Sequence, residues 1–272
     1  MQNQIAIGLR DKDYLPDVAS KIPGKAIDFI IQSPGGLAEA TETRVDHLRS
    51  RFDDIRVIVP GTAKSAATML AMCADQIVMD ELSELGPTDP QMFVNGRYSP
   101  AGAILKQFNL AQEALKNDPS SMAAWLPVLQ MYGPSLIMEC QHHLDLSRNL
   151  VGTWLKQYMF KADAAHAAKA DEIAAWLTED DNFLTHNHRV SVTALREKGV
   201  NVLDMSTEPA LQNAVRELYY AIMATFDGTG AFKFFENSEN QLLSLGVVVQ
   251  IAQAVPLPGG PRMAGMPLRV SQ

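Results

Sequence analysis

The feature that most constrains the fold is a regular alternation of short apolar strands with helices in the first third of the chain. Near-continuous apolar runs at 26–32, 55–59 and 76–79 predict buried strands, and the segments 37–52 and 65–74 between them predict helices. Strands that alternate with helices form parallel sheets through right-handed crossovers. The sequence therefore predicts an α/β fold built on a parallel sheet.

Further elements are expected on both sides of this unit. Residues 3–9 predict a short strand, and residues 13–22 predict a helix that Pro and Gly then close. The middle of the chain is helical in pattern, with a long amphipathic helix over 135–160. We expect one domain over residues 1–235 and a C-terminal extension over 236–272 that ends in a loose tail.

Charge and composition exclude several functional classes. The 272 residues carry a net charge of −8, whereas nucleic acids and anionic membrane surfaces require a basic face. No run is long and apolar enough for a membrane helix, and the N-terminus has no signal sequence. The two cysteines are far apart, which predicts reduced thiols. We expect a cytoplasmic protein that binds neither nucleic acid nor membrane.

Three loops follow the predicted strands, at the sheet edge where α/β proteins place their sites. They are SPGG at 33–36, GTAKSAA at 61–67 and ELGPTDPQ at 84–91. Ser65 lies in the second loop, where a helix begins. Its hydroxyl either caps that helix, which is a common use of serine, or acts as a nucleophile.

The glycine pair in the first loop favours the nucleophile. An activated serine needs two backbone N–H groups that converge on the oxyanion. Gly36 can supply one of them, and Ala66, directly after Ser65, can supply the other. A side chain at Gly35 or Gly36 would crowd a substrate carbonyl that approaches the backbone, which gives a physical reason for glycine there.

These motifs resemble the Clp protease/crotonase superfamily, and most closely the serine dehydrogenase proteinases among its signal peptide peptidase A-like members. The similarity is close over residues 26–92 and looser to about residue 235. It implies a spiral of β-β-α units with a helical C-terminal part. It also implies a serine endopeptidase for peptide or protein substrates, with Ser65 as nucleophile and the N–H groups of Gly36 and Ala66 as oxyanion hole. Gly35 and Leu37 would line the bound substrate.

The chain departs from its relatives at two points that concern the catalytic base. Ala67 replaces a glycine that relatives often have, and Asp-Pro-Gln at 89–91 stands where the Clp subunit has its histidine base. Stomatin-linked relatives use a lysine downstream of the serine instead, and Lys106 lies at a comparable position. Its apolar neighbours would lower the pKa of its amine, as a lysine base requires. We therefore expect a Ser65–Lys106 pair.

Other bases remain open. His186 and His188 in FLTHNHRV are the competing candidates, whereas Lys116 has the pattern of a solvated helix lysine. The two histidines also resemble metal ligands, but no neighbouring residues complete a metal site. No glycine-rich dinucleotide fingerprint follows the first strand. We expect neither a metal nor a cofactor.

The same resemblance leaves two other functions open and implies that the protein forms a homo-oligomer. The crotonase branch uses equivalent N–H groups to bind an acyl-thioester enolate, but it needs no serine at position 65. A non-catalytic pseudo-peptidase scaffold is the other alternative. Relatives form trimers, tetramers or rings, and the apolar segments 125–133 and 154–160 have more apolar surface than one sheet covers. We therefore expect a homo-oligomer.

Overall fold

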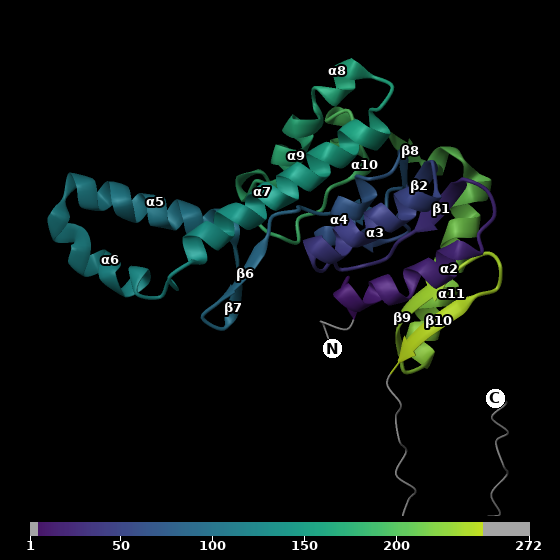
Figure 1. The fold of residues 1–272 in the computed structure, drawn as a ribbon, viewed down its shortest axis with the longest axis horizontal. Helices are drawn as coiled ribbons and strands as arrows, with labels where there is room; N and C mark the ends of the chain where they lie inside the picture. Colours follow the sequence, from purple (N-terminus) through teal and green to yellow (C-terminus); the bar gives the residue numbers. More distant parts are fainter. Residues whose placement is uncertain (1–4, 247–272) are drawn as a thin grey trace, which may run out of the picture.

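The computed structural model describes residues 5–246 of the chain, and a parallel sheet lies at its centre (Figure 1). The strand order is β1–β2–β4–β8, and all three pairings are parallel. The predicted α/β fold with a parallel sheet is thus confirmed. The four strands are β1 (Ala26–Ile30), β2 (Asp54–Ile58), β4 (Gln76–Met79) and β8 (Val202–Asp204).

Alternating side chains of the sheet strands enter two different cores. Ile55 and Val57 belong to the large core that α3 and α4 also join, while Ile58 and Val78 pack with Val215 of α11 in a separate small core. Because strand side chains alternate between the two faces, helices cover the sheet on both sides. These helices are α3 (Ala38–Arg51), α4 (Ala66–Ala71) and α11 (Pro209–Gly228).

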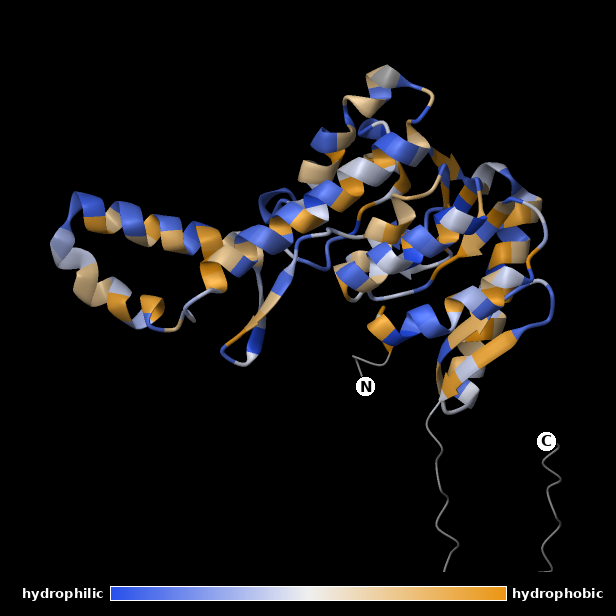
Figure 2. Cartoon of the chain, viewed as in Figure 1, coloured by the Kyte–Doolittle hydropathy of each residue, from blue (hydrophilic) through white to orange (hydrophobic). Residues whose placement is uncertain are grey.

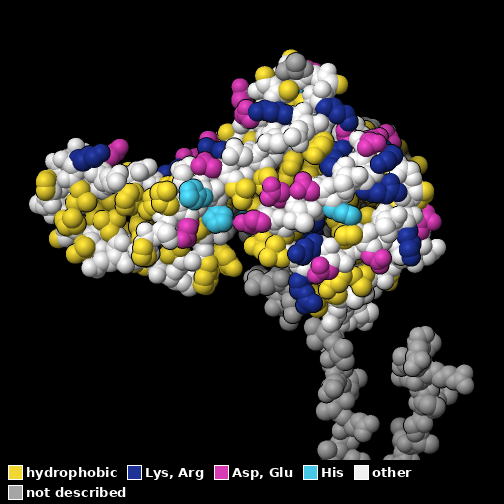
Figure 3. Space-filling model, in the orientation of Figure 1, with side chains coloured by type: hydrophobic (Ala, Val, Ile, Leu, Met, Phe, Trp, Pro, Cys, Tyr) yellow, Lys and Arg dark blue, Asp and Glu magenta, His cyan; other side chains and the backbone are white. Residues whose placement is uncertain are grey.

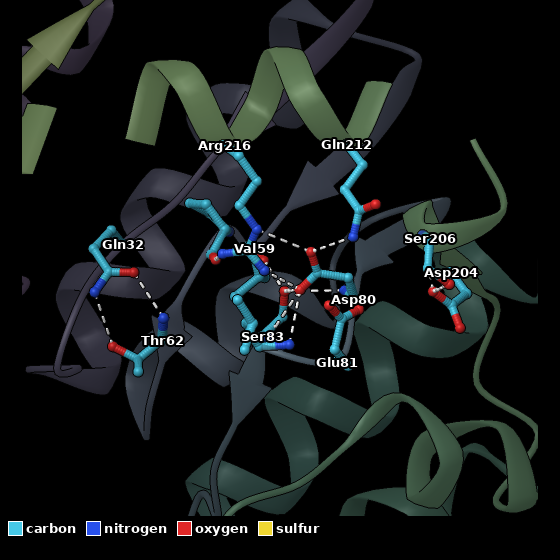
Figure 4. Close-up of polar contacts among 12 residues, drawn as sticks. Gln32, Val59, Thr62, Asp80, Glu81, Ser83, Asp204, Ser206, Gln212 and Arg216 are labelled. Carbon is cyan, nitrogen blue, oxygen red and sulfur yellow. Dashed lines mark hydrogen bonds and ion pairs between the residues drawn. The ribbon is translucent and has the colours of Figure 1, made fainter. Parts of the chain in front are cut away.

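A buried carboxylate fastens α11 to the carboxyl ends of the central strands (Figure 4). Asp80 accepts hydrogen bonds from Gln212 Nε2 at 3.1 Å and Arg216 Nε at 3.1 Å, and Arg216 also donates to the carbonyl of Pro60 at 2.6 Å. Burial acts to raise the pKa of Asp80, but these hydrogen bonds outweigh it and hold the pKa below its ordinary value. These contacts between Asp80 and α11 were not predicted from the sequence.

A β-hairpin, which the sequence analysis missed, follows the third loop. Asn95 and Gly96 form its two-residue turn with φ of 53° and 79°. Positive φ at both positions is the signature of the tight turns that Asn-Gly favours between antiparallel strands. The hairpin strands are β6 (Gln91–Val94) and β7 (Arg97–Pro100).

The middle of the chain forms a helical arm that projects from the sheet (Figure 1). Its helices α5 (Ala101–Asn117) and α6 (Met122–Leu129) carry many apolar residues (Figure 2). The predicted long helix appears as α7 (Leu136–Trp154), continued by a π-helical turn (Leu155–Met159), and packs against α9 (Ala170–Thr178). Within residues 5–246, none of the helices has the length and hydrophobicity to cross a bilayer.

The two ends of the described chain lie beside each other. Of the strand predicted over 3–9, the described residues 5–9 contain one bridge, between Ile7 and Gly36. Strands β9 (Ala231–Glu236) and β10 (Leu242–Gly246) form a hairpin, so the predicted extension from 236 begins inside β9, and its remainder from 247 lies outside the described residues. The other helices are η1 (Leu9–Asp13), α2 (Leu15–Ser20), η2 (Pro119–Ser121), α8 (Ala164–Ala167), η4 (Asp180–Asn182), α10 (Val192–Glu197) and η5 (Met205–Thr207).

Candidate active site

Ser65 occupies a strained turn between a short strand and a helix. Strand β3 (Thr62–Ala63) precedes it and α4 follows it, and its backbone has φ 51° and ψ −120°. A non-glycine residue in such a conformation costs roughly 1–3 kcal/mol, and strain of this kind clusters at functional sites. Ser65 stands at the cap position of α4, yet its side chain caps nothing. The capping role considered from the sequence is therefore wrong.

The two predicted loops lie against each other. Ser33 N donates to the carbonyl of Thr62 at 2.9 Å, and Lys64 N donates to the carbonyl of Ser33 at 3.1 Å. A Cβ added to Gly35 would lie 2.8 Å from Ser65 Cβ, and the φ of Gly35 is +107°. Only glycine fits this close approach, so Gly35 is required by the turn that carries Ser65.

Gly36 has a different requirement from the one the sequence analysis proposed. A Cβ on Gly36 would lie 2.2 Å from the carbonyl oxygen of Ile7. The neighbouring groups bind Ile7 directly, through Ile7 N to the carbonyl of Gly35 at 2.7 Å and Leu37 N to the carbonyl of Ile7 at 3.0 Å. Glycine is therefore needed at position 36 for the approach of Ile7, a contact within the protein itself.

Two backbone donors remain free beside Ser65. Because successive residues of an extended chain point to opposite sides, the N–H of Gly36 faces away from Ile7. Within the described chain neither this N–H nor that of Ala66 donates a hydrogen bond to the protein. A Cβ on Gly35 would lie 3.3 Å from Ala66 N, so the glycine corner and the start of α4 are in contact.

An Asp–His pair joins the third loop to the segment at 185–190. His186 Nδ1 is 2.7 Å from Asp89 Oδ1, and Gln91 Nε2 donates to Asp89 Oδ2 at 2.6 Å. Asp89 is only 2% exposed. From the sequence, Asp-Pro-Gln was placed in the third loop and contrasted with a histidine of the relatives, but Asp89 was not paired with His186. The pairing joins two residues that are distant in sequence, and spacing alone gave no signal for it.

Strand β5 connects the His186 loop to the Ser65 turn. Thr62–Ala63 of β3 pairs in parallel with Glu84–Leu85 of β5, and Leu85 in turn bridges Val190 through hydrogen bonds of 3.1 and 3.0 Å. His188 contacts the ring of Phe183 at 5.5 Å between centroids. In the described residues, no group of three or more His, Cys, Asp or Glu side chains could hold a metal ion.

Lys106 lies in a different environment from the one predicted. Its side chain is 45% exposed and forms ion pairs with Asp180 and Asp181, each at 2.6 Å. Partial burial acts to lower the pKa of Lys106, but the hydrogen bonds that it donates to the two carboxylates prevail and raise the pKa. The predicted lowering of its pKa by apolar neighbours is therefore wrong. Lys116 is exposed near the end of α5.

Comparisons with known proteins identify similar sequences. A family model described as ClpP-like SDH-type serine proteinase matches residues 13–229. The uncharacterized proteins MJ0137 and MJ1495 of Methanocaldococcus jannaschii are 34% and 30% identical over 178 residues, which is 65% of this chain in both cases. The matches cover 54% and 51% of these relatives, so the chain spans about half of their length.

Solved structures with similar folds include two variants of a 1510-N membrane-bound stomatin-specific protease, one of them in complex with a substrate peptide. Their TM-scores are 0.46 and 0.43 at 16% and 15% sequence identity. The similarity covers 76% and 72% of this chain and 79% and 70% of the two relatives.

Proposed function

The chain belongs to the ClpP-like SDH-type serine proteinases, and from this premise we propose that it is a serine endopeptidase whose nucleophile is Ser65. The observation that carries the proposal is the strained turn that holds Ser65 between a strand and a helix, with its hydroxyl free of any capping bond. A nucleophile on a sharp strand-to-helix turn is exposed to substrate while the adjacent helix supplies an N–H donor.

We infer that His186 is the general base. Its Nδ1 lies within hydrogen-bond distance of Asp89, so the carboxylate favours the tautomer with the proton on Nδ1 and leaves Nε2 to accept a proton. Gln91 binds the second oxygen of Asp89 and keeps the carboxylate oriented toward the imidazole. Among the described residues no hydrogen bond joins His186 Nε2 to Ser65 Oγ, and a bond between base and nucleophile commonly tightens only when substrate is bound.

The proposed reaction has two steps, the acylation of Ser65 and the hydrolysis of the resulting ester. Ser65 Oγ bonds to the scissile carbonyl carbon while its proton passes to His186 Nε2, and the carbonyl oxygen becomes an oxyanion. The N–H groups of Gly36 and Ala66 stabilise that charge. The C–N bond then breaks as Nε2 gives its proton to the leaving amine. Water hydrolyses the resulting ester by the same steps and regenerates Ser65.

The Ser65–Lys106 mechanism expected from the sequence is the rival arrangement. A lysine base must be neutral, whereas the ion pairs of Lys106 with Asp180 and Asp181 favour its charged form. For this mechanism Lys106 would have to leave both carboxylates when substrate binds. His186 can accept a proton at Nε2 while its Nδ1 stays paired with Asp89, and we therefore favour the mechanism with His186 as the base.

A complex with a peptide boronate tests the oxyanion hole. We expect a covalent bond from Ser65 Oγ to boron and one boronate oxygen at about 2.7–3.1 Å from the N–H groups of Gly36 and Ala66. Leu37, which is 49% exposed, is expected beside the bound peptide together with Gly35. A boronate bound elsewhere, or an oxygen directed away from both N–H groups, would contradict the assignment.

We also propose that the protein is a homo-oligomer, because the arm exposes many large apolar side chains (Figure 3). Contiguous apolar surface of this kind marks protein–protein contacts. Light scattering at micromolar concentration is expected to give a multiple of the chain mass, and a stable monomer would exclude the proposal. The exposed side chains of the arm include Leu110, Met122, Leu126 and Met131.

A further inference from the structure

Lys64, the residue directly before the proposed nucleophile, has a largely buried side chain for which the proposed mechanism has no use. The side chain of Lys64 is 13% exposed, and its Nζ lies 3.1 Å from Glu84 Oε2. Nζ also donates to the carbonyl of Leu85 at 3.0 Å and to the carbonyl of His188 at 3.5 Å. A buried charge is costly unless partners satisfy it, and here one carboxylate and two carbonyls do so.

The absence of a side chain at Gly86 leaves room for the side chain of Lys64. A Cβ on Gly86 would lie 2.7 Å from Lys64 Cδ, so the lysine stem passes directly over the Gly86 backbone. Gly86 N donates to Thr68 Oγ1 at 3.0 Å, and Thr68 Oγ1 donates to the carbonyl of Ala63 at 2.7 Å. The Lys64 side chain therefore runs along the junction between β5 and the start of α4.

Two of the acceptors of Lys64 link it to the segment that carries His186. The carbonyl of Leu85 also accepts a hydrogen bond from Val190 N at 3.0 Å, so one oxygen joins β5, Lys64 and the loop. His188 N donates to the carbonyl of Thr185 at 3.1 Å, which closes a turn around His186. A single ammonium thus connects the turn that holds Ser65 to His188 directly and, through the carbonyl of Leu85, to Val190.

We propose that Lys64 is a positioning residue that holds the 185–190 loop, and with it His186, in register with Ser65. The proposal rests on the proposed function, in which His186 serves as base for Ser65. Because Lys64 and Ser65 are adjacent, any movement of the loop relative to Lys64 is also a movement of the base relative to the nucleophile. A misplacement of about 1 Å can lower a rate about a hundredfold.

The test compares Lys64→Met with Glu84→Gln in the full chain. Lys64→Met removes all three contacts of the ammonium, whereas Glu84→Gln leaves both hydrogen bonds to the carbonyls in place. We expect Lys64→Met to lower kcat by about tenfold to a hundredfold with little change in KM. We also expect it to speed amide hydrogen exchange at His188 and Val190, while Glu84→Gln stays within a few-fold of wild type in both measurements.

A fluorophosphonate probe separates this proposal from the proposed function. Wild type and Lys64→Met should both be labelled to one probe per chain, the variant more slowly. If the wild type is not labelled at Ser65, the proposed function itself fails. If labelling is intact but Lys64→Met keeps wild-type kcat and loop exchange, the positioning role fails. Complete loss of labelling in folded Lys64→Met would indicate that Lys64 is the base, and it would also overturn the positioning role. Lys64→Gln, which keeps one donor, replaces Lys64→Met if the latter does not fold.

Discussion

Ser65→Ala is expected to lower kcat for peptide hydrolysis by about a million-fold, the size of loss seen when a serine peptidase loses its nucleophile. The physical reason is that no covalent acyl-enzyme forms without the hydroxyl. The same variant should lose all reaction with a fluorophosphonate probe, measured by intact mass. The fold should persist, because the Ser65 side chain caps no helix in the structure.

Ser50→Ala is the matched control for this experiment. The hydroxyl of Ser50 is exposed near the end of α3 and donates only to the carbonyl of His47. We expect full activity and full labelling of this variant. If folded Ser65→Ala still hydrolyses peptides, the nucleophile is another residue. If the wild type neither hydrolyses peptides nor reacts with the probe, the scaffold alternative gains support and the peptidase proposal fails.

His186→Ala is expected to have the second largest effect, a loss of about 10⁴-fold to 10⁶-fold in kcat. Asp89→Asn should lower kcat by about 10⁴-fold, because an amide at this position favours the wrong imidazole tautomer. His188→Ala changes the neighbouring histidine of the same turn and should stay within a few-fold of wild type. Lys106→Ala should also retain activity. If instead Lys106→Ala abolishes turnover while His186→Ala does not, lysine is the base.

The pH dependence distinguishes the two bases without any substitution. A histidine or lysine that serves as general base accepts a proton only when it is neutral, so activity rises with pH through the pKa of that group. The pKa of Lys106 is raised by its two carboxylate partners. With Lys106 as the base, the rise would therefore come above the ordinary range of lysine, and a profile that is already level in that range would exclude Lys106 as the base. A profile of kcat/KM between pH 5 and pH 11 would decide between them.

Local patterns in the sequence were sufficient for three strands of the sheet and for the turn that holds Ser65. The predicted strand over 76–79 coincides with β4, because a short apolar run bounded by polar residues has few alternatives in a parallel sheet. The contact between the SPGG loop and the Ser65 turn also followed from the strand order, since both loops lie at the carboxyl ends of neighbouring strands. The Clp protease-like α/β fold is confirmed by the family match.

The Asn-Gly turn of the β6–β7 hairpin was within reach of the sequence and was missed. Asn95 and Gly96 lie between two short strands and carry the strongest local signal for a two-residue hairpin. No element was predicted for this segment from the sequence. A local preference that is fully encoded in two adjacent residues needed no tertiary information.

By itself the sequence determined the α/β class and pointed to Ser65 in the second loop as the candidate nucleophile, because apolar periodicity and glycine corners are properties of adjacent residues. Only the tertiary structure decided which partners the charged groups meet. Asp89 binds His186 and Lys106 binds Asp180 and Asp181, although each pair is far apart along the chain. An ionisable group takes its pKa from the burial and the charges around it, and these are fixed only when distant segments pack together.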